Sequence, residues 1–390
     1  CELVATPSVN PMGRVVTGPP YLENRLTETL EAIFARLRIR TQRQPVEPGR
    51  ENLIALLEGD VPPEQGGSLV LLDAHQDTVP VDGMTIDPFR PERRDGRVYG
   101  RGACDTKAGM AAMLTALARL ADQRPPGMPS ILLACTVNEE YGFTGATRLT
   151  ELFGPGAGSI VPRRPDCAVV AEPTGLDVVV AHKGMVRWCC HTRGRAAHSA
   201  NPTAGENAIY RMARVLAALE QYASSVVGRV GGHPLCGPAT LSVGTIHGGV
   251  SVNTVPDRCT IEIDRRVSPG EDHHLARLAV IDYLRSELGP DFPVDHDPPG
   301  LSGPALPDTE NGPLAERLIT VARHVHGSCQ RCGVPYGTHA AVYAAAGVPS
   351  VVFGPGFIEQ AHTRDEWVPV DQVHAAVEAY YRFCLEGWQR

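Results

Sequence analysis

An apolar stretch at residues 69–74 leads directly into His75 and, two residues later, Asp77. A histidine that binds a metal needs its second ring nitrogen held by a carboxylate or a carbonyl, and Asp77 is well placed to hold His75. A histidine that follows a core strand is also commonly a structural residue. His75 alone therefore leaves both interpretations open.

Two consecutive carboxylates, Glu139 and Glu140, follow the apolar stretch 131–137 and Asn138. Two such groups cannot both be buried as anions unless a cation or a proton compensates their charge. On a surface they would be ordinary acidic residues. In a cleft, one of them becomes a base beside a metal ligand.

Three further candidates, Asp105, Glu172 and His362, stand in comparable places. Asp105 lies in a glycine-rich turn before an alanine-rich helix, Glu172 follows an apolar run, and His362 follows a Gly-Pro turn. Each has a structural alternative, such as a helix cap or a turn residue. Taken together, two histidines and several carboxylates, nearly all at strand ends in one layer, fit the mixed nitrogen and oxygen ligands of a two-metal hydrolase.

Hydrophobic spacing predicts the elements that must position these residues. Strands alternate with helices, which implies an α/β layer with a mostly parallel sheet and a site at the carboxyl ends of its strands. The strands are expected at 52–57, 68–73, 131–137, 166–171 and 350–353, and the helices at 22–37, 110–120, 312–325, 340–346 and 372–385.

The pattern changes after residue 183 to strand, helix, strand, strand and helix, which predicts a small α+β module with an antiparallel sheet. These elements are expected at 186–192, 207–222, 239–246, 258–266 and 273–288, and a Pro/Gly-rich linker at 295–308. A chain of 390 residues is also long for one hydrophobic core. We therefore predict a domain formed by residues 1–183 and 295–390, with residues 184–294 inserted in it.

Charge and composition exclude several classes of partner. The net charge is −8 and no Lys/Arg-rich stripe is present, which argues against nucleic acid. The longest apolar runs are far shorter than the roughly 20 residues that cross a bilayer, which argues against a membrane. Eleven irregularly spaced cysteines, among them a lone Cys329-x-x-Cys332 pair, predict reduced thiols in the cytoplasm. The run 3–8 resembles the end of a helix whose beginning is missing, so we expect a trimmed N-terminus without a signal peptide.

In this order the motifs resemble those of the M20 metallopeptidase family, which includes acetylornithine deacetylase, succinyl-diaminopimelate desuccinylase, aminoacylase and glutamate carboxypeptidase. The resemblance covers essentially the whole chain. It implies a zinc-peptidase-like catalytic domain, with a mixed, mostly parallel sheet flanked by helices, and an inserted ferredoxin-like dimerisation or lid domain. The motifs are His75-x-Asp77, Gly-Arg-Gly-Ala-Cys-Asp105-x-Lys-x-Gly, Asn-Glu139-Glu140, Glu172-Pro-Thr and Gly-Pro-Gly followed by Ala-His362-Thr.

The resemblance also implies a two-metal site. His75 and Glu172 would bind one ion, Glu140 and His362 the other, and Asp105 would bridge the two. Zinc is the expected metal, with cobalt or manganese as alternatives, because this ligand set accepts all three.

The same resemblance assigns the catalytic roles to two more residues. Glu139 would be the general base that takes a proton from a metal-bridging water and passes it to the leaving amine. Asp77 would orient His75. Two cations lower the pKa of such a water and hold the carbonyl oxygen as charge develops on it.

Residues of the inserted domain would complete the site of a homodimer. His198 would reach the partner subunit's active site and stabilise the oxyanion, and Asn253 and Arg266 would bind the substrate carboxylate. His339 departs from the family pattern, because relatives often carry Asp, Glu or Ser there. We place it in a loop that borders the substrate pocket.

The predicted function is hydrolysis of the amide bond of an N-acyl amino acid, as in acetylornithine deacetylase or succinyl-diaminopimelate desuccinylase. An M20 carboxypeptidase or dipeptidase acting on short peptides is the alternative, because only the substrate pocket separates these enzymes. A non-catalytic binding protein with the same fold is the distant alternative. Loss of Glu139 or of a metal ligand would mark such a protein, and none is lost.

Overall fold

The computed structural model describes residues 1–16, 18–154, 159–225, 227 and 232–385. The chain forms two compact units. The first contains residues 1–180, 307–333 and 338–390, and the second contains residues 181–306 and 334–337. The insertion predicted at 184–294 lies within the second unit, and the exact domain boundaries stay a prediction.

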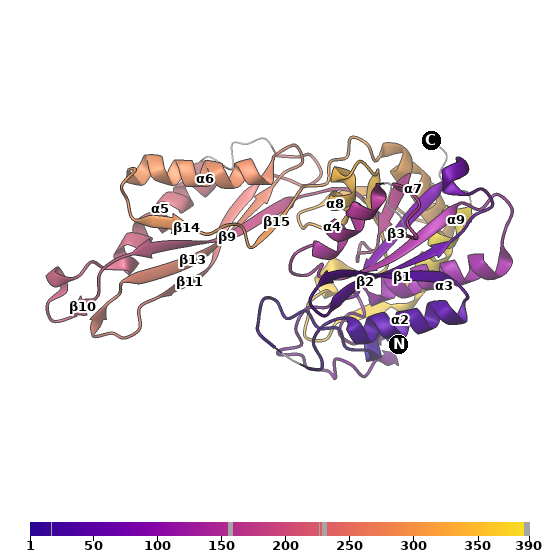
Figure 1. The fold of residues 1–390 in the computed structure, drawn as a ribbon, viewed down its shortest axis with the longest axis horizontal. Coiled ribbons are helices and arrows are strands. Elements are labelled where there is room, and N and C mark those ends of the chain that lie inside the picture. The colour runs from indigo at the N-terminus through magenta and orange to yellow at the C-terminus, as the bar shows by residue number, and fades with distance from the viewer. Residues whose placement is uncertain (17, 155–158, 226, 228–231, 386–390) are drawn as a thin grey trace. The chain divides into compact units, whose positions relative to one another are not determined.

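The first unit is built on a mixed sheet whose central strands are parallel (Figure 1). The pairs β6–β3, β3–β7 and β7–β17 are parallel, whereas the pairs β1–β2, β2–β6 and β17–β8 are antiparallel. The predicted mixed α/β sheet is thus confirmed. In order across the sheet the strands are β1 (Arg40–Glu47), β2 (Arg50–Leu57), β6 (Ser130–Thr136), β3 (Leu69–His75), β7 (Cys167–Val170), β17 (Ser350–Val352), β8 (Val178–His182) and β16 (Arg331–Val334).

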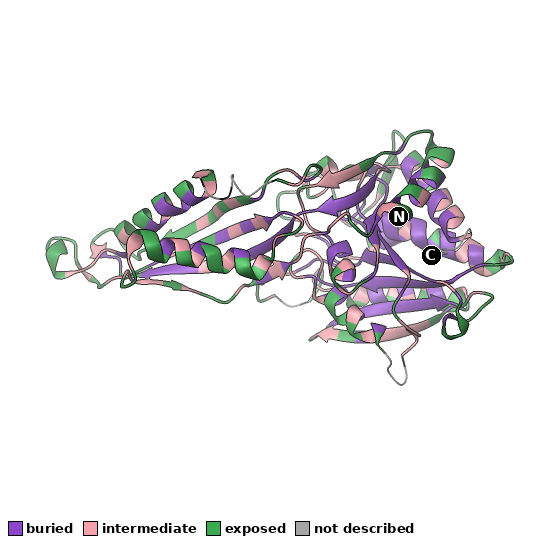
Figure 2. Ribbon diagram, turned by 90° about the horizontal axis from the view of Figure 1, so that it is seen from above, coloured by how far each residue is buried: buried purple, intermediate pink, exposed green. Residues whose placement is uncertain are grey.

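Every residue of β3, β6 and β7 is buried, as expected for apolar strands covered by helices on both faces (Figure 2). Helices α3 and α7 both pack against α9, α2 packs on β1 and β2, and α4 packs against α8. The strands β4 (Glu92–Arg94), β5 (Arg97–Tyr99) and β18 (Trp367–Pro369) form a small separate sheet. The helices are α1 (Glu2–Ala5), α2 (Asn24–Arg36), α3 (Lys107–Gln123), α4 (Thr144–Thr150), α7 (Gly312–His326), α8 (Ala340–Ala345) and α9 (Val370–Leu385).

The second unit is an antiparallel sheet with two helices packed on it. Both helices bury apolar residues, such as Met212 and Val280, in the same core as Trp188 of the sheet. The strands are β9 (Gly184–Arg193), β11 (Thr240–Gly248), β13 (Arg258–Val267), β14 (Val294–His296) and β15 (Leu301–Gly303), the helices are α5 (Ala208–Ser225) and α6 (His273–Leu288), and β10 (Ala197–His198) pairs with β12 (Thr254–Val255).

The stretch 295–308 is not a plain linker, contrary to our prediction. β14 pairs with β9 at residues 190–192, and β15 pairs with it at residues 185–187, so both extend the sheet of the second unit. Proline and glycine punctuate these short strands, which is why the sequence pattern resembles a loop.

Two negative predictions can be compared with the described residues. All eleven cysteines lie in the described residues, and none forms a disulfide bond, Cys329 and Cys332 included. Within the described part of the chain, no helix is long and apolar enough to span a membrane.

Candidate metal centre

The candidate ligands come together because the strands that precede them are parallel neighbours. His75 is the last residue of β3, Glu139 and Glu140 follow β6, Glu172 follows β7, and His362 comes after β17. The carboxyl ends of parallel strands meet at one edge of a sheet. Residues far apart in sequence are therefore placed around one point.

Asp105 lies between two pairs of these side chains. Its Oδ1 atom is 3.0 Å from Nε2 of His75, and its Oδ2 atom is 3.2 Å from Nε2 of His362. Glu172 Oε1 lies 3.9 Å from Nε2 of His75, and Glu140 Oε2 lies 3.2 Å from Nε2 of His362. Each oxygen of Asp105 thus faces one histidine–glutamate pair, which is the arrangement that a bridging carboxylate requires.

The electrostatics of this cluster call for added positive charge. Glu140 Oε1 and Glu172 Oε1 are buried without a hydrogen-bond partner. Burial and the nearby Asp105 raise the pKa of both glutamates. Buried anionic oxygens without donors are costly, and divalent cations remove that cost when histidine and carboxylate ligands converge.

Ligand spacing also fits metal ions. His75, Asp105 and Glu140 offer atoms that all lie within 4.8 Å of one another, and so do His75, Glu139 and Glu172. The five residues predicted as metal ligands are therefore gathered in one place, and they fit two divalent ions. Their individual roles stay a prediction.

Asp77 contacts both His75 and the turn that carries the two glutamates. Its main-chain carbonyl lies 2.9 Å from Nδ1 of His75, whereas its carboxylate Oδ1 is 3.7 Å from that atom. The carboxylate instead accepts hydrogen bonds from the backbone N–H groups of Glu139 and Glu140, each at 3.1 Å. Asp77 thus orients His75 through its backbone, and its side chain fixes the Glu139–Glu140 turn.

Asn10, near the N-terminus, supports the same turn and was not predicted from the sequence. The side-chain amide of Asn10 donates to Asp77 Oδ2 at 2.7 Å and to Asn138 Oδ1 at 2.9 Å. A second contact to the N-terminal segment comes from the buried Lys107, whose ammonium group donates to the carbonyl of Thr6 at 2.7 Å. Burial lowers the pKa of Lys107 to about 7. A lone asparagine in an irregular segment carries no periodic signal, so only the fold reveals these contacts.

His339, which we predicted to border the substrate pocket, is buried in the first unit, and its role toward a substrate stays a prediction. It directly precedes helix α8, and the whole residue is 0% exposed to solvent. Its Nδ1 atom lies 3.0 Å from Asp73 Oδ2 and 3.2 Å from Thr136 Oγ1, and its ring packs edge-on against Phe143. The packed rings and the buried carboxylate hold His339 in the core of the first unit.

Replacing His339 by alanine is expected to lower the free energy of unfolding by about 1.5–3 kcal/mol, because the buried Asp73 carboxylate loses a hydrogen bond. KM should stay near the wild-type value. Denaturant unfolding and steady-state kinetics measure the two effects, with the exposed His324→Ala as control. A raised KM at unchanged stability would restore the substrate-contact interpretation.

The three candidates of the second unit lie on its sheet and loops. His198 in β10 is exposed and pairs with Thr254 of β12, and Asn253 is exposed next to that strand. Arg266 in β13 is held by Asp264 at 3.0 Å, whereas Arg265 is buried, as expected for the opposite face of the strand. Their roles toward a substrate stay predictions.

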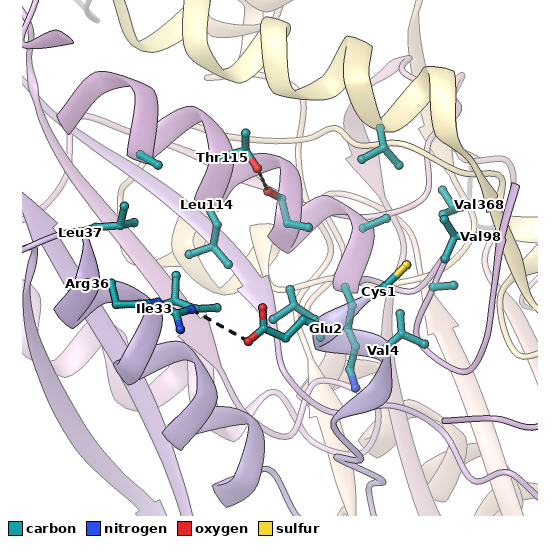
Figure 3. A pocket seen from close by; sticks show the side chains of 17 residues that line it. Cys1, Glu2, Val4, Ile33, Arg36, Leu37, Val98, Leu114, Thr115 and Val368 are labelled. Carbon is teal, nitrogen blue, oxygen red and sulfur yellow. Dashed lines mark hydrogen bonds and ion pairs between the residues drawn. The ribbon is translucent and has the colours of Figure 1, made fainter. Parts of the chain in front are cut away.

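A separate pocket of about 460 Å³ lies at the N-terminus of the first unit (Figure 3). Helices α1, α2 and α3 line it with mostly apolar side chains, and Glu2 forms an ion pair with Arg36 across it at 4.0 Å. None of the five candidate metal ligands lines this pocket. It is therefore distinct from the metal centre.

A cluster of histidines and carboxylates that fits divalent ions, at the carboxyl ends of parallel strands in an α/β unit, is typical of metal-dependent hydrolases. The chain belongs to peptidase family M20/M25/M40, whose sequence profile matches residues 71–386. The chain is 33% identical to an acetylornithine deacetylase of Myxococcus xanthus over 326 aligned residues. This alignment covers 83% of this chain and 80% of that protein.

Solved structures share the fold over nearly the whole chain. An M20 family metallo-carboxypeptidase from Sulfolobus solfataricus matches with a TM-score of 0.78 and 17% identity, covering 98% of this chain and 97% of that one. A tripeptidase from Staphylococcus aureus matches with a TM-score of 0.75 and 23% identity, covering 98% and 96%. A dinuclear metal-binding peptidase of the M20 family from Bacillus subtilis matches with a TM-score of 0.65 and 16% identity, covering 99% and 95%. The predicted family and fold class are both confirmed.

Ion binding is expected to release protons and to strengthen as the pH rises. Burial alone would lower the pKa of His362, but hydrogen bonds to Asp105 and Glu140 raise it to about 11 in the ion-free protein. His362 therefore holds a proton at neutral pH, and an ion must displace it. Each displaced proton changes the affinity by about tenfold per pH unit below that pKa.

Titration calorimetry with zinc in buffers of different ionisation heat counts the protons released. The described cluster predicts release of at least one proton per protein. An affinity that is constant between about pH 6 and pH 8 would contradict this assignment of His362.

Proposed function

We propose that this chain hydrolyses the amide bond of an N-acyl amino acid, as acetylornithine deacetylase does, with two divalent ions as cofactors. Zinc is the expected ion, with cobalt or manganese as alternatives. The observation that carries this proposal is the position of Asp105, whose two oxygens face His75 and His362. The identity to an acetylornithine deacetylase supports the choice of substrate class.

Two divalent ions, when bound, polarise the substrate carbonyl and lower the pKa of a water molecule. Glu139 then acts as the general base and later as the acid. In the ion-free protein, burial, with Glu140 and Asp105 nearby, raises the pKa of Glu139 well above its usual value, although His75 opposes the shift. Bound cations oppose this shift, so that Glu139 is ionised when it takes a proton from the attacking water and can return that proton to the leaving amine.

Asp77 prepares Glu139 for this step. Because its carboxylate accepts the N–H groups of Glu139 and Glu140, the turn cannot rotate without breaking two charge-assisted hydrogen bonds. In the second unit, Arg266 and Asn253 bind the substrate carboxylate, and His198 stabilises the oxyanion in the active site of the partner subunit. Arg266 suits this role because its planar guanidinium can meet a carboxylate with two parallel hydrogen bonds.

A substrate panel tests the proposal against its alternatives. N-acetyl and N-succinyl amino acids, C-terminally extended peptides and dipeptides are compared by kcat/KM. We expect an N-acyl amino acid to exceed every peptide by at least about tenfold, because acyl and peptide substrates differ in the groups that fill the pocket. Preference for a dipeptide would favour the peptidase alternative, and no turnover by the metal-loaded protein would favour the binding protein.

We also propose a homodimer formed through the second unit. Its apolar side chains Val250 and Val252 are 92% and 99% exposed, and they line a groove of about 830 Å³ together with Tyr210 of α5. Exposed apolar residues gathered beside an edge strand such as β11 are typical of an interface.

Val252→Asp is expected to shift the protein from dimer to monomer in sedimentation equilibrium, because a buried charge opposes association. Val61→Asp, at a half-exposed valine of the first unit, is the matched control and should remain dimeric. A wild-type protein that is monomeric at micromolar concentration would overturn the dimer.

A further inference from the structure

We propose that Glu366 is a positioning residue that holds Asp105 between the two metal positions, an inference that rests on the proposed function. Glu366 lies four residues after His362, and its side chain is 1% exposed. It contacts neither the candidate ions' ligand atoms nor the substrate groups predicted above. Its influence on the centre therefore acts through the backbone of the loop at 100–105.

Both carboxylate oxygens of Glu366 are used by that loop. Oε1 accepts the backbone N–H groups of Cys104 at 2.8 Å and Asp105 at 3.0 Å. Oε2 accepts the N–H of Gly102 at 3.1 Å and Nη1 of Arg101 at 2.6 Å. The main-chain carbonyl of Glu366 accepts a further N–H, from residue 100, at 3.0 Å. One side chain thus satisfies four buried donors.

The loop depends on these bonds because it has no helix or strand of its own before α3. Gly100 and Gly102 have φ values of +143° and +79°, a conformation that glycine adopts without a side-chain clash. Removing the carboxylate would leave several buried donors without acceptors. The backbone of Asp105, and hence the direction of its carboxylate, would no longer be fixed.

Glu366 also links two ligands of the same ion. His362 and Glu366 belong to one short segment, and Asp105 is bonded directly to Glu366 through its N–H. The distance of 3.2 Å between His362 Nε2 and Asp105 Oδ2 therefore depends on a single segment. Groups that hold a ligand in place commonly change metal affinity by about 10–100-fold when removed.

If the ion pair between Glu366 and Arg101 only stabilised the fold, the loss of Glu366 would have different effects. Its loss would lower the unfolding temperature but leave the affinity for ions and their ligand geometry unchanged. Ion affinity and the spectrum of a bound ion therefore separate positioning from simple stabilisation.

The experiment uses the full chain with Glu366→Gln, which keeps the shape of the side chain but removes its charge. Zinc binding to the metal-free protein is followed by titration calorimetry, and the visible absorption of the cobalt-loaded protein reports ligand geometry. We expect the weaker-bound of the two ions to lose about 10–100-fold in affinity, with an altered cobalt spectrum and a lower kcat at similar KM.

Glu378→Gln is the matched control, because Glu378 is also paired with arginines, Arg119 and Arg382, but lies on α9 away from the loop. It should bind both ions as the wild type does. Should Glu366→Gln fail to fold, Glu366→Asp keeps the charge one methylene further from the loop, and its ion affinity should fall in the same direction.

The outcomes distinguish this inference from the function on which it rests. A folded Glu366→Gln protein that binds both ions with wild-type affinity and spectrum would overturn the positioning role while the hydrolase proposal stands. A wild-type protein that binds no divalent ion would overturn both.

Discussion

Replacing Glu139 by glutamine should lower kcat/KM by about 10²–10⁴-fold, the range that a positioned general base contributes. The amide has nearly the same size and can still hydrogen-bond, but it cannot take a proton from water. The backbone N–H of residue 139 would still be held by Asp77, so the turn should keep its shape. The loss should therefore appear in kcat, with little change in KM.

Metal content is the decisive second measurement for this variant. Glu139 lies near enough to His75 and Glu172 for their ligand atoms to fall within 4.8 Å, so its carboxylate could itself be a ligand. A base leaves the ion content of Glu139→Gln at the wild-type level, whereas a ligand lowers it. Glu58→Gln, which changes an exposed glutamate paired with Arg40, controls for the chemistry of the substitution.

Replacing Asp105 by asparagine should affect both ions, because each of its oxygens faces a different histidine. Metal ions stabilise the transition state by several kcal/mol, so their loss should lower kcat/KM by about a thousandfold or more. Atomic emission spectrometry of the dialysed Asp105→Asn protein should find fewer than two metal ions per chain. Glu172→Gln offers the comparison, because it should weaken mainly the ion beside His75.

The unfolding temperature of the metal-free Asp105→Asn protein completes this test. Hydrogen bonds from His362 and His75 hold the pKa of Asp105 well below its usual value, against the opposing effect of burial. A carboxyl with a lowered pKa stabilises the folded state above its unfolded pKa, and that stability is lost as the pH falls. The variant should thus be less stable than the wild type near neutral pH, and two ions retained at wild-type affinity would rule out the bridging role.

Several elements that carry or precede these ligands were predictable from their apolar residues. The buried strands β3 and β6 and the helix α3 follow apolar patterns that the sequence displays directly. Strand exits then place His75 and Glu172 at one edge, since parallel strands align their carboxyl ends. The five metal residues follow from these patterns and from the family resemblance.

The remaining contacts depend on folding over long sequence distances. Asn10 and Asp77 are 67 residues apart, and Glu366 and Asp105 are 261 apart, so no local pattern connects them. The burial of His339 was missed for the same reason. A histidine beside Thr338 and Gly337 reads as a loop residue, whereas its buried partner Asp73 is visible only in the fold.

The position of β17 bears on how the protein is made. β17 pairs with β7 on one side and with β8 on the other, yet residues 183–349 separate it from both in the sequence. During synthesis, β7 and β8 leave the ribosome long before their common neighbour exists. Until β17 is synthesised, the edges of β7 and β8 that pair with it stay unpaired. Unpaired strand edges are prone to aggregation. Because His362 emerges later still, metal loading should be one of the last steps of maturation, after the second unit has been synthesised.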